Sequence, residues 1–432
     1  MAHGAIFGEG ASAAWMDDER RQLAIRDWKA VLAHEDVVLH CGPRGQYSLH
    51  VRDVLVIAED DLDDPRFVAN QEDLGDPRIE RTGLGFATVH FTRTVDVVSV
   101  ARFLRSLQGE RPLRVGPDHL LSPSQGGVLG PGSPPHSTRP GRGVLQRRQE
   151  MAAVDPSVRV AVIDSGLVAG PLADPMLAAS RLATTSSAAN PAPDPLWDGH
   201  QLRHWEGGHG THVAGVLSAA AGGTASIIHY AVLDEALLPL PLVSDTAVAV
   251  AVAGAIKEGC RVLNLSLSGP VAADFDSIAT SLVLGEAAGT AGRKRTQRDD
   301  DAVVVAAAGN ERTSDPRYPA ALSGVIGVGA LDTRGRHRAK FSNFGRWVDC
   351  CAVGEKVFGP YVTGGGGPML NDAHLPFKGW AYWSGTSFAT PYVAGLIAAE
   401  LAAGTSSARV AAASVLAAGV PMPGLEIGVK VG

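Results

Sequence analysis

The stretch VRVAVIDSG, residues 158–166, predicts the fold of the larger part of the chain. Its apolar run ends in an aspartate and a Ser-Gly turn, and the segment GTHVAGVLSAAA at 210–221 carries apolar residues at helical spacing. Fully apolar strands that alternate with helices are typical of a parallel sheet covered on both faces. We therefore expect a three-layer α/β domain with a mainly parallel sheet over 156–432, with further strands at 261–266, 302–307 and 324–329 and a buried helix at 247–256.

A small α+β unit is expected in front of this domain, over residues 47–122. Residues 96–107 have helical spacing, and Asp96 is suited to be the N-cap. Strands are expected on either side of this helix, at 50–58, 86–91 and 113–121.

Two segments flank this unit. Residues 1–46 form an expected N-terminal extension, with a short helix at 17–32. Residues 123–155 are dense in Pro, Gly and Ser, a composition that buries little apolar surface, so we expect an exposed linker there. A charged surface insertion is expected at 289–301.

Composition limits the classes of function. The 432 residues carry a formal net charge of −7, which gives no reason to expect nucleic acid as a partner. The four cysteines are too few for a disulfide framework, and the vicinal pair at 350–351 is expected to be simply buried. No apolar run reaches membrane-spanning length, and the first residues lack a secretory pattern, so we expect a cytoplasmic protein with no membrane partner. No metal-ligand spacing is evident, so neither a metal nor a cofactor is expected.

Three segments carry residues for nucleophilic catalysis. Asp164 follows an apolar strand, His209 opens the helical pattern in GGHGTHVAG (207–215), and Ser387 lies in WSGTSFATPYVAG (383–395). A serine hydroxyl is a weak nucleophile that needs a base within hydrogen-bond reach, and the base needs a carboxylate that fixes its tautomer. The three residue types all lie at the ends of expected elements, where distant parts of a chain converge.

Together the motifs resemble the subtilase family of serine peptidases, over roughly residues 156–420. Asp-Ser-Gly, His-Gly-Thr-His-Val-Ala-Gly and Ser-Gly-Thr-Ser-Phe-Ala-Thr-Pro occur here in the order known for subtilisin. The resemblance implies a subtilisin-like serine endopeptidase in which Asp164 orients the imidazole, His209 moves the proton and Ser387 forms the acyl-enzyme. The run AAAGNE (306–311) resembles the family's oxyanion segment, which implies that the Asn310 amide donates to the developing oxyanion.

The resemblance also implies a substrate-binding strand and a specificity pocket. LSLSGP (265–270) resembles the strand that pairs with the peptide backbone, and Ser268 stands where glycine is common. Small residues are expected on the opposite wall, and Arg317 precedes Tyr-Pro, where the family commonly places the pocket floor. The residues implied to bind substrate are Ser266, Leu267, Ser268, Gly269, Ala308, Gly309 and Arg317.

The charge of the pocket floor is open at this point. An inward Arg317 favours an acidic substrate side chain, whereas an inward Asp315 favours a basic one. The alternative is that both side chains face solvent or pair with each other.

The resemblance gives the unit at 47–122 the role of a prodomain, a folding chaperone and transient inhibitor of the same chain. Self-cleavage is then expected within 122–150, and the alternative is a permanent adaptor for a partner or substrate. Residues 363–377 look like an insertion before the nucleophile, a hairpin at the rim of the cleft. The expected partners are a protein or peptide substrate, either general or a single dedicated precursor. A catalytically silent binding protein is the alternative from another class.

Overall fold

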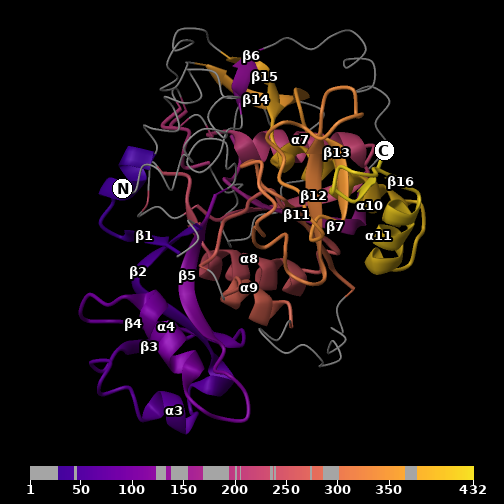
Figure 1. Ribbon diagram of the computed structural model, residues 1–432. Helices are drawn as coiled ribbons and strands as arrows, with labels where there is room; N and C mark the ends of the chain where they lie inside the picture. The colour runs from indigo at the N-terminus through magenta and orange to yellow at the C-terminus, as the bar shows by residue number, and fades with distance from the viewer. Residues whose placement is uncertain are drawn as a thin grey trace.

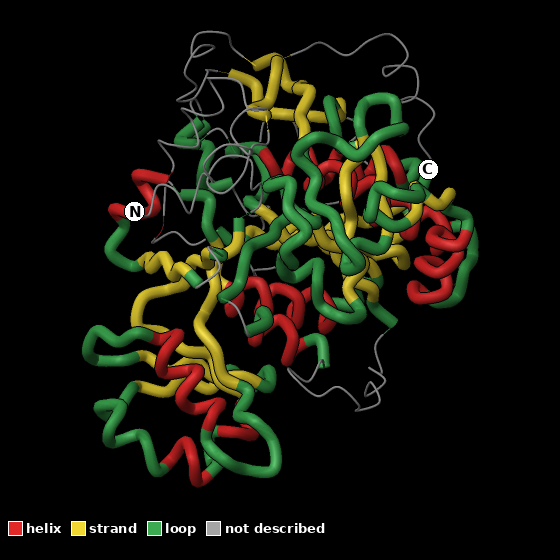
Figure 2. Tube along the Cα trace, viewed as in Figure 1, coloured by secondary structure: helices red, strands yellow, loops and turns green. Residues whose placement is uncertain are grey.

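The computed structural model describes residues 28–42, 46–122, 133–137, 154–168, 194–199, 202–204, 206–233, 237, 240–272, 275–285, 301–364 and 377–432. Figure 1 shows the small N-terminal unit beside a larger domain in which helices cover a central sheet. Figure 2 shows the same arrangement by element type. None of the helices in these ranges has the length and apolar character needed to cross a bilayer.

The central sheet of the large domain has eight strands among the described residues, in the order β16-β17-β13-β12-β11-β10-β7-β8. All neighbouring pairs are parallel except β16 and β17, as the apolar runs predicted. The strands are β7 (Asp155–Asp164), β8 (Ala225–Ala231), β10 (Val262–Leu265), β11 (Val303–Ala307), β12 (Val325–Leu331), β13 (Cys350–Val353), β16 (Val420–Pro421) and β17 (Val429–Lys430).

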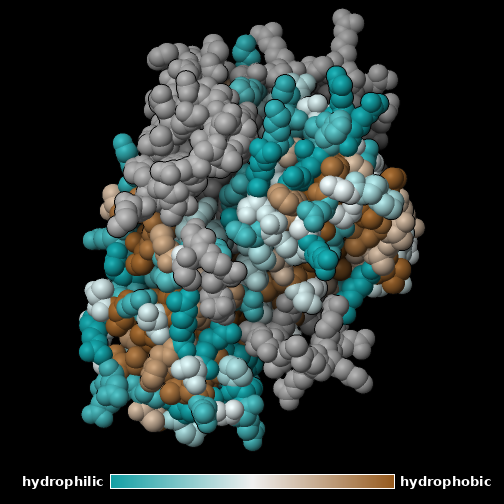
Figure 3. Space-filling view, viewed as in Figure 1, coloured by the Kyte–Doolittle hydropathy of each residue, from teal (hydrophilic) through white to brown (hydrophobic). Residues whose placement is uncertain are grey.

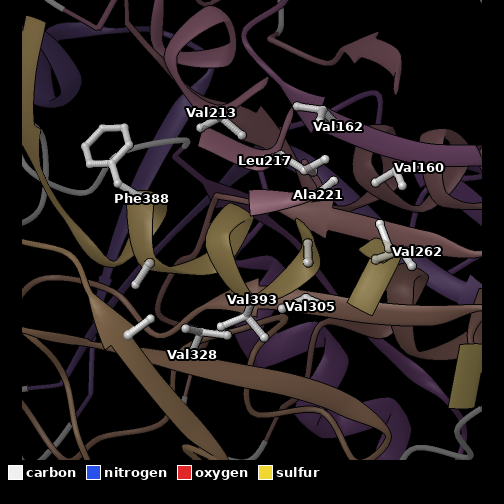
Figure 4. Close-up of a cluster of buried hydrophobic side chains, with 14 of the residues drawn as sticks. Val160, Val162, Val213, Leu217, Ala221, Val262, Val305, Val328, Phe388 and Val393 are labelled. Atoms are coloured by element: carbon white, nitrogen blue, oxygen red, sulfur yellow. The ribbon is translucent and has the colours of Figure 1, made fainter. Parts of the chain in front are cut away.

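Helices cover both faces of this sheet, which makes the three layers. On β7, Val160 and Val162 face a core that includes residues of α7 (His209–Ala220) and α10 (Thr386–Ala402), part of which is drawn in Figure 4. The alternate residues Ala161 and Ile163 face a second core, against α8 (Asp245–Lys257). Two smaller helices complete the layers, α9 (Ile278–Val283) and α11 (Ala408–Ala417). Alternate residues of a buried strand point to opposite faces of the sheet. Because an apolar layer covers each face, the residues on both faces of the strand are apolar.

The N-terminal unit is an antiparallel sheet with one main helix packed on it. Its strands are β1 (Val37–Cys41), β2 (Tyr47–Ala58), β3 (Arg78–Arg81), β4 (Phe86–His90) and β5 (Val115–Leu121). The helix α4 (Val97–Ser106) begins as predicted, with the Asp96 carboxylate accepting a hydrogen bond from the Ser99 amide. The shorter helices η1 (Glu59–Asp61) and α3 (Pro65–Val68) lie between β2 and β3.

The structure differs from the predicted extension at the start of this unit. β1 pairs with β2 over five positions although it lies in the segment expected to precede the unit. Residues 28–33 are helical and overlap the end of the helix expected at 17–32, whose earlier part lies outside the described residues. The outer surface of the unit mixes hydrophilic and hydrophobic side chains (Figure 3), and Val68 and Phe103 are among the large apolar residues exposed on it.

The sheet of the N-terminal unit continues into the large domain. The end of β5 pairs antiparallel with β9 (Val243–Ser244), so that Leu121 lies opposite Val243. One residue further, Ser122 forms an antiparallel bridge with Ser268 of the large domain. The two units are therefore joined by backbone hydrogen bonds as well as by apolar packing.

A third sheet of three strands lies beside α7. It consists of β14 (Val357–Gly364), β15 (Phe377–Ser384) and β6 (Ser133–Ser137), in the order β14-β15-β6. β14 and β15 pair antiparallel on either side of the hairpin predicted at 363–377, most of which, residues 365–376, lies outside the described ranges. β6 falls in the segment predicted to be an exposed linker, yet it pairs with β15 and Pro135 is buried, because the edge of β15 offers backbone partners that composition does not reveal. The predicted insertion at 289–301 lies outside the described residues except for Asp301.

Candidate active site

The predicted catalytic residues lie at the carboxyl edge of the central sheet. The strand order reverses beside β7, because β8 lies on one side of it and β10 on the other. Such a reversal opens a crevice at the carboxyl ends of parallel strands. Asp164 ends β7, His209 begins α7, and Ser387 lies in the first turn of α10.

Asp164 and His209 form a fully buried hydrogen-bonded pair. The Nδ1 atom of His209 lies 2.7 Å from Oδ1 of Asp164, and both side chains have zero exposure. The same carboxylate oxygen accepts a bond of 2.7 Å from the Ser165 amide, which fixes its orientation. The carboxylate therefore holds the imidazole with a proton on Nδ1, and Nε2 has no hydrogen-bond partner among the described residues.

Aromatic rings fix the plane of the imidazole. Trp383 lies edge-on to His209 with ring centroids 5.3 Å apart, and the ring of Phe388 lies at 5.2 Å on a tilted plane. Both aromatic residues are fully buried, so they exclude water from this side of the Asp164–His209 bond. The same two rings pack on His212, whose Nδ1 lies 3.2 Å from the Pro360 carbonyl and whose pKa burial lowers to about 3. His212 is thus a neutral structural residue of α7.

Ser387 and Asn310 supply the remaining polar groups. The Ser387 hydroxyl donates to the Ser266 carbonyl at 3.2 Å, which anchors it beside the predicted substrate-binding strand. The Asn310 carbonyl oxygen accepts from the amide of Thr386 at 2.8 Å and from its hydroxyl at 3.1 Å. These two donors fix the orientation of the Asn310 side chain, and they leave its buried amide nitrogen without a partner in the described part of the chain. That nitrogen is an available donor at the N-terminus of α10, where an oxyanion would be stabilised.

The predicted substrate-binding strand is engaged on both sides. The Ser122 amide donates to the Ser268 carbonyl at 3.1 Å, and the Ser268 amide donates to the Ser122 carbonyl at 3.0 Å. On the next residue, Gly269 exchanges two bonds of 2.9 Å with Tyr318. A Cβ atom on Gly269 would lie 2.6 Å from a side-chain atom of Leu121, so only glycine permits β5 to approach this closely.

Arg317 is buried, so the alternative that it faces solvent is wrong, and among the described residues it forms an ion pair with Glu311. Its Nε lies 3.5 Å from Oε1 of Glu311, and the two side chains are only 8% and 9% exposed. The guanidinium also donates to the backbone carbonyls of Asp315 and Pro316, at 3.4 and 3.2 Å. Burial raises the pKa of Glu311, while Arg317 acts in the opposite direction. The floor thus contains an ion pair, and Glu311 was missed although it follows Asn310 directly in the sequence.

Asp194 is a second buried carboxylate that no motif indicated. It accepts hydrogen bonds from the Ser165 hydroxyl at 2.8 Å, the Gly208 amide at 2.7 Å and the Leu196 amide at 2.9 Å. The Ser165 hydroxyl in turn accepts from the Gly210 amide at 3.1 Å. Asp194 therefore ties the turn after β7 to the start of α7, the two segments that carry the catalytic pair. Burial raises its pKa to about 6.

The other polar clusters give no sign of a metal centre. No group of three or more His, Cys, Asp or Glu side chains in the described ranges is arranged to hold a metal ion. Cys350 and Cys351 are buried and unpaired to each other, in agreement with the prediction that they are ordinary core residues.

Comparison with known proteins supports the assignment of the fold. Thermitase from Thermoactinomyces vulgaris is 33% identical over 215 residues, which are 48% of this chain and 65% of thermitase. The thermophilic serine proteinase of Bacillus sp. (strain AK1) is 36% identical over 197 residues, 44% of this chain and 41% of that protein. The matched part of this chain thus spans less than two-thirds of either relative.

Fervidolysin from Fervidobacterium pennivorans, described as a keratinolytic enzyme related to subtilisin, superposes with a TM-score of 0.58 at 19% identity. The superposition covers 88% of this chain and 60% of fervidolysin, and it confirms the subtilisin-like fold. The sequence profile of the subtilase family matches residues 155–419, which is more than half of the chain. The chain belongs to the subtilase family.

Proposed function

We propose that this chain is a serine endopeptidase that uses Ser387, His209 and Asp164 as its catalytic triad. The observation that carries the proposal is the buried His209–Asp164 bond. It leaves Nε2 without a partner among the described residues, while Phe388, the residue after Ser387, packs on the same imidazole. The unpaired Asn310 amide supports the same chemistry, because a donor without a ground-state partner is suited to an oxyanion that forms during the reaction.

The reaction follows from these groups. The Ser387 hydroxyl gives its proton to Nε2 of His209 as its oxygen bonds to the carbonyl carbon of the substrate peptide. The carbonyl oxygen becomes negative and is held by the Asn310 amide and the backbone at the start of α10. When the C–N bond breaks, His209 returns the proton to the leaving amine, and an acyl ester remains on Ser387. A water molecule then cleaves the ester by the same steps, with water in place of the serine.

The N-terminal unit acts in this proposal as an inhibitor of its own chain. The end of β5 pairs with two segments of the large domain. Leu121 pairs with Val243, and Ser122 pairs with Ser268 of the predicted substrate-binding strand. A substrate peptide that binds to Ser268 by β-addition needs the same backbone groups. Docked in this way, the unit competes with every other substrate, and it also templates the edge of the crevice during folding.

The pairing register supports a proposal for the bond that the chain would cut in itself. In an antiparallel pair the position numbers of opposite residues have a constant sum. A strand that continued the Ser122–Ser268 register would therefore bring the position two places after Ser122 opposite Ser266. The Ser266 carbonyl is the one that the Ser387 hydroxyl contacts at 3.2 Å. The residue two places after Ser122 is Ser124, followed by Gln125, and both lie outside the described residues. We place self-cleavage between Ser124 and Gln125, inside the range expected from the sequence.

Intact-mass spectrometry of the purified full chain, before and after a fluorophosphonate probe, tests the proposal. Wild type is expected to gain one probe on Ser387 and to lose the segment up to Ser124, and Ser387→Ala should do neither. Ser414→Ala is the matched control, because Ser414 is exposed on α11, and it should behave as wild type. If wild type neither labels nor is cut, the alternative of a catalytically silent binding protein replaces this proposal.

The substrate is proposed to be a restricted one in the cytoplasm, such as a precursor peptide. A docked unit that must be displaced before any hydrolysis supports a selective role over general digestion. Incubation of the processed chain with a cell extract tests this idea, because a restricted peptidase cuts few proteins while a general one cuts most of them.

A further inference from the structure

Two segments that lie beside Ser387, and that would form the walls of a substrate crevice, come together near Gly309. The strands β10 and β11 are neighbours, with Leu265 opposite Ala306, and the walls are the segments that follow them, residues 266–269 and 307–311. Ser387 and Asn310 both lie at this crevice. A substrate residue whose carbonyl lies between these two groups therefore directs its side chain between the walls. For a substrate peptide that pairs with Ser268 as Ser122 does, the residue in this position is the one just before the scissile bond.

The walls are close together. A Cβ atom placed on Gly309 would lie 3.1 Å from the Ser268 hydroxyl and 2.8 Å from a carboxylate oxygen of Glu311. The Ser268 hydroxyl and the Glu311 carboxylate therefore already fill the space beside Gly309. Ser268 is 2% exposed. A long substrate side chain finds no room here without moving backbone or breaking the contacts of Glu311.

The end of the crevice carries a compensated pair of charges. Glu311 faces Arg317 and also accepts a hydrogen bond from the Asn343 amide, so both carboxylate and guanidinium have partners within the protein. Burial raises the pKa of Tyr47 of the N-terminal unit, and Arg317 lowers it while Glu311 raises it, so Tyr47 lies near the same pair. An acidic or basic substrate side chain would have to compete with an existing buried partner.

We propose that Ser268, Glu311 and Arg317 restrict the residue before the scissile bond to small, uncharged side chains such as alanine, serine or glycine. The inference rests on the proposed peptidase function and adds a substrate class to it. It replaces the acidic preference that an inward arginine alone would give, since Glu311 neutralises that arginine.

Four peptides that differ only at the residue before the cut, alanine, phenylalanine, aspartate or lysine, test the inference with the processed chain. The expected kcat/KM for alanine exceeds that for phenylalanine by about 10- to 100-fold, which corresponds to about 1.4–2.8 kcal/mol, within the range that overpacking costs. Aspartate and lysine are expected to be at least about 100-fold slower than alanine, since each charge would be buried against an existing ion pair. Equal rates for alanine and phenylalanine, or for alanine and aspartate, would overturn the inference.

Two variants separate the contributions of size and charge. Ser268→Gly is expected to raise the phenylalanine-to-alanine ratio at least about 10-fold, because it removes the hydroxyl that narrows the crevice. Glu311→Gln is expected to raise the aspartate-to-alanine ratio at least about 10-fold, because Arg317 is then left uncompensated. Glu72→Gln is the matched control on the exposed surface of the N-terminal unit and should leave both ratios unchanged. Unchanged ratios in both pocket variants would contradict the inference.

A second readout does not depend on catalysis. In the full chain carrying Ser387→Ala, hydrogen exchange of the Ser268 amide reports whether β5 stays docked, since that amide donates to Ser122. Adding Ser124→Phe is expected to speed this exchange at least about 10-fold, and adding Ser124→Ala is not. Equal exchange in the two variants would overturn the pocket assignment. If no peptide is cut and Ser387 takes no probe, the peptidase proposal fails alone, and this exchange measurement still decides on the pocket.

Discussion

Leu121 offers the sharpest test of how the N-terminal unit is held. Its side chain has zero exposure, and it packs in the apolar cluster of the large domain that includes Val243, Leu265 and Leu267. These neighbours contact Leu121 only while β5 is docked. Leu121→Ala therefore removes its contribution from the docked state and leaves the undocked state nearly unchanged.

The size of the effect follows from burial. Replacing a fully buried leucine by alanine costs about 2–5 kcal/mol, and each 1.4 kcal/mol is a factor of about ten in an equilibrium constant. The free energy of undocking is thus expected to fall enough to raise the open population by about 30- to 5,000-fold. Amides that exchange through this opening should exchange faster by the same factor.

Hydrogen exchange followed by mass spectrometry measures this, in chains that also carry Ser387→Ala to prevent cleavage. The reporting amides are those of Ser122 and Ser268, which bond to each other across the two units. The Val89 amide in β4 serves as an internal reference for the folding of the unit itself. Leu32→Ala is the matched control, because Leu32 is 51% exposed, and it should change these rates less than about threefold. If Leu121→Ala leaves exchange at Ser268 as slow as in the parent while Val89 is unaffected, Leu121 does not hold the strand, and the account of inhibition is wrong.

Three further predictions concern single polar groups. Asn310→Leu removes the unpaired donor and should lower kcat by a factor of about 10²–10³ with little change in KM, which is the loss known for one such donor in subtilisin. An unchanged kcat would exclude Asn310 from the oxyanion site. His119 on β5 accepts from the Ala272 amide at 3.0 Å across the two units, and burial, with a smaller effect of His50, lowers its pKa to about 3. The docking equilibrium should therefore be at its strongest above about pH 6.5, and its constant should fall by up to tenfold per pH unit as the pH falls from there toward 3. Faster hydrogen exchange at Ser268 would report this weakening. His119→Gln should flatten the pH dependence, and an unaltered slope would contradict the role of His119. Burial raises the pKa of Asp194 to about 6 from an ordinary value of 3.8, so its contribution to the free energy of unfolding falls as the pH rises from about 4 to about 6. Denaturant titrations at several pH values measure this dependence. Asp194→Asn should remove this part of the dependence of stability on pH, and an identical dependence in the variant would contradict the prediction.

The fold of the large domain was predictable because its buried strands are apolar on both faces. Val160 to Ile163 are all buried, two facing each helical layer, and this produces the continuous apolar run that the sequence shows. The triad was predictable for a different reason. The triad residues lie in motifs that contain small residues, because the tight turns after β7 and before α7 need them. Gly208, just before α7, has a φ of 84°, which favours glycine.

The parts that sequence did not reveal are contacts between distant segments. Asp194 bonds to Ser165 and Gly208 from a segment with no motif, and nothing in its neighbours indicates that it is buried. The Glu311–Arg317 pair depends on how two loops converge, which periodicity does not describe. β6 was likewise assigned to a linker because its partner β15 is more than 200 residues away in the chain. The cytoplasmic location stays a prediction.

The central claim is that His209 activates Ser387, and the rate of fluorophosphonate labelling tests it most directly. The measurement is the second-order rate constant for labelling Ser387 in the full chain, in wild type and in His209→Ala. Because the hydroxyl is a weak nucleophile without a base, the account predicts a rate at least about 1,000-fold lower in His209→Ala. Equal rates in the two proteins would contradict the claim, since the buried His209–Asp164 pair would then have no part in the chemistry of Ser387.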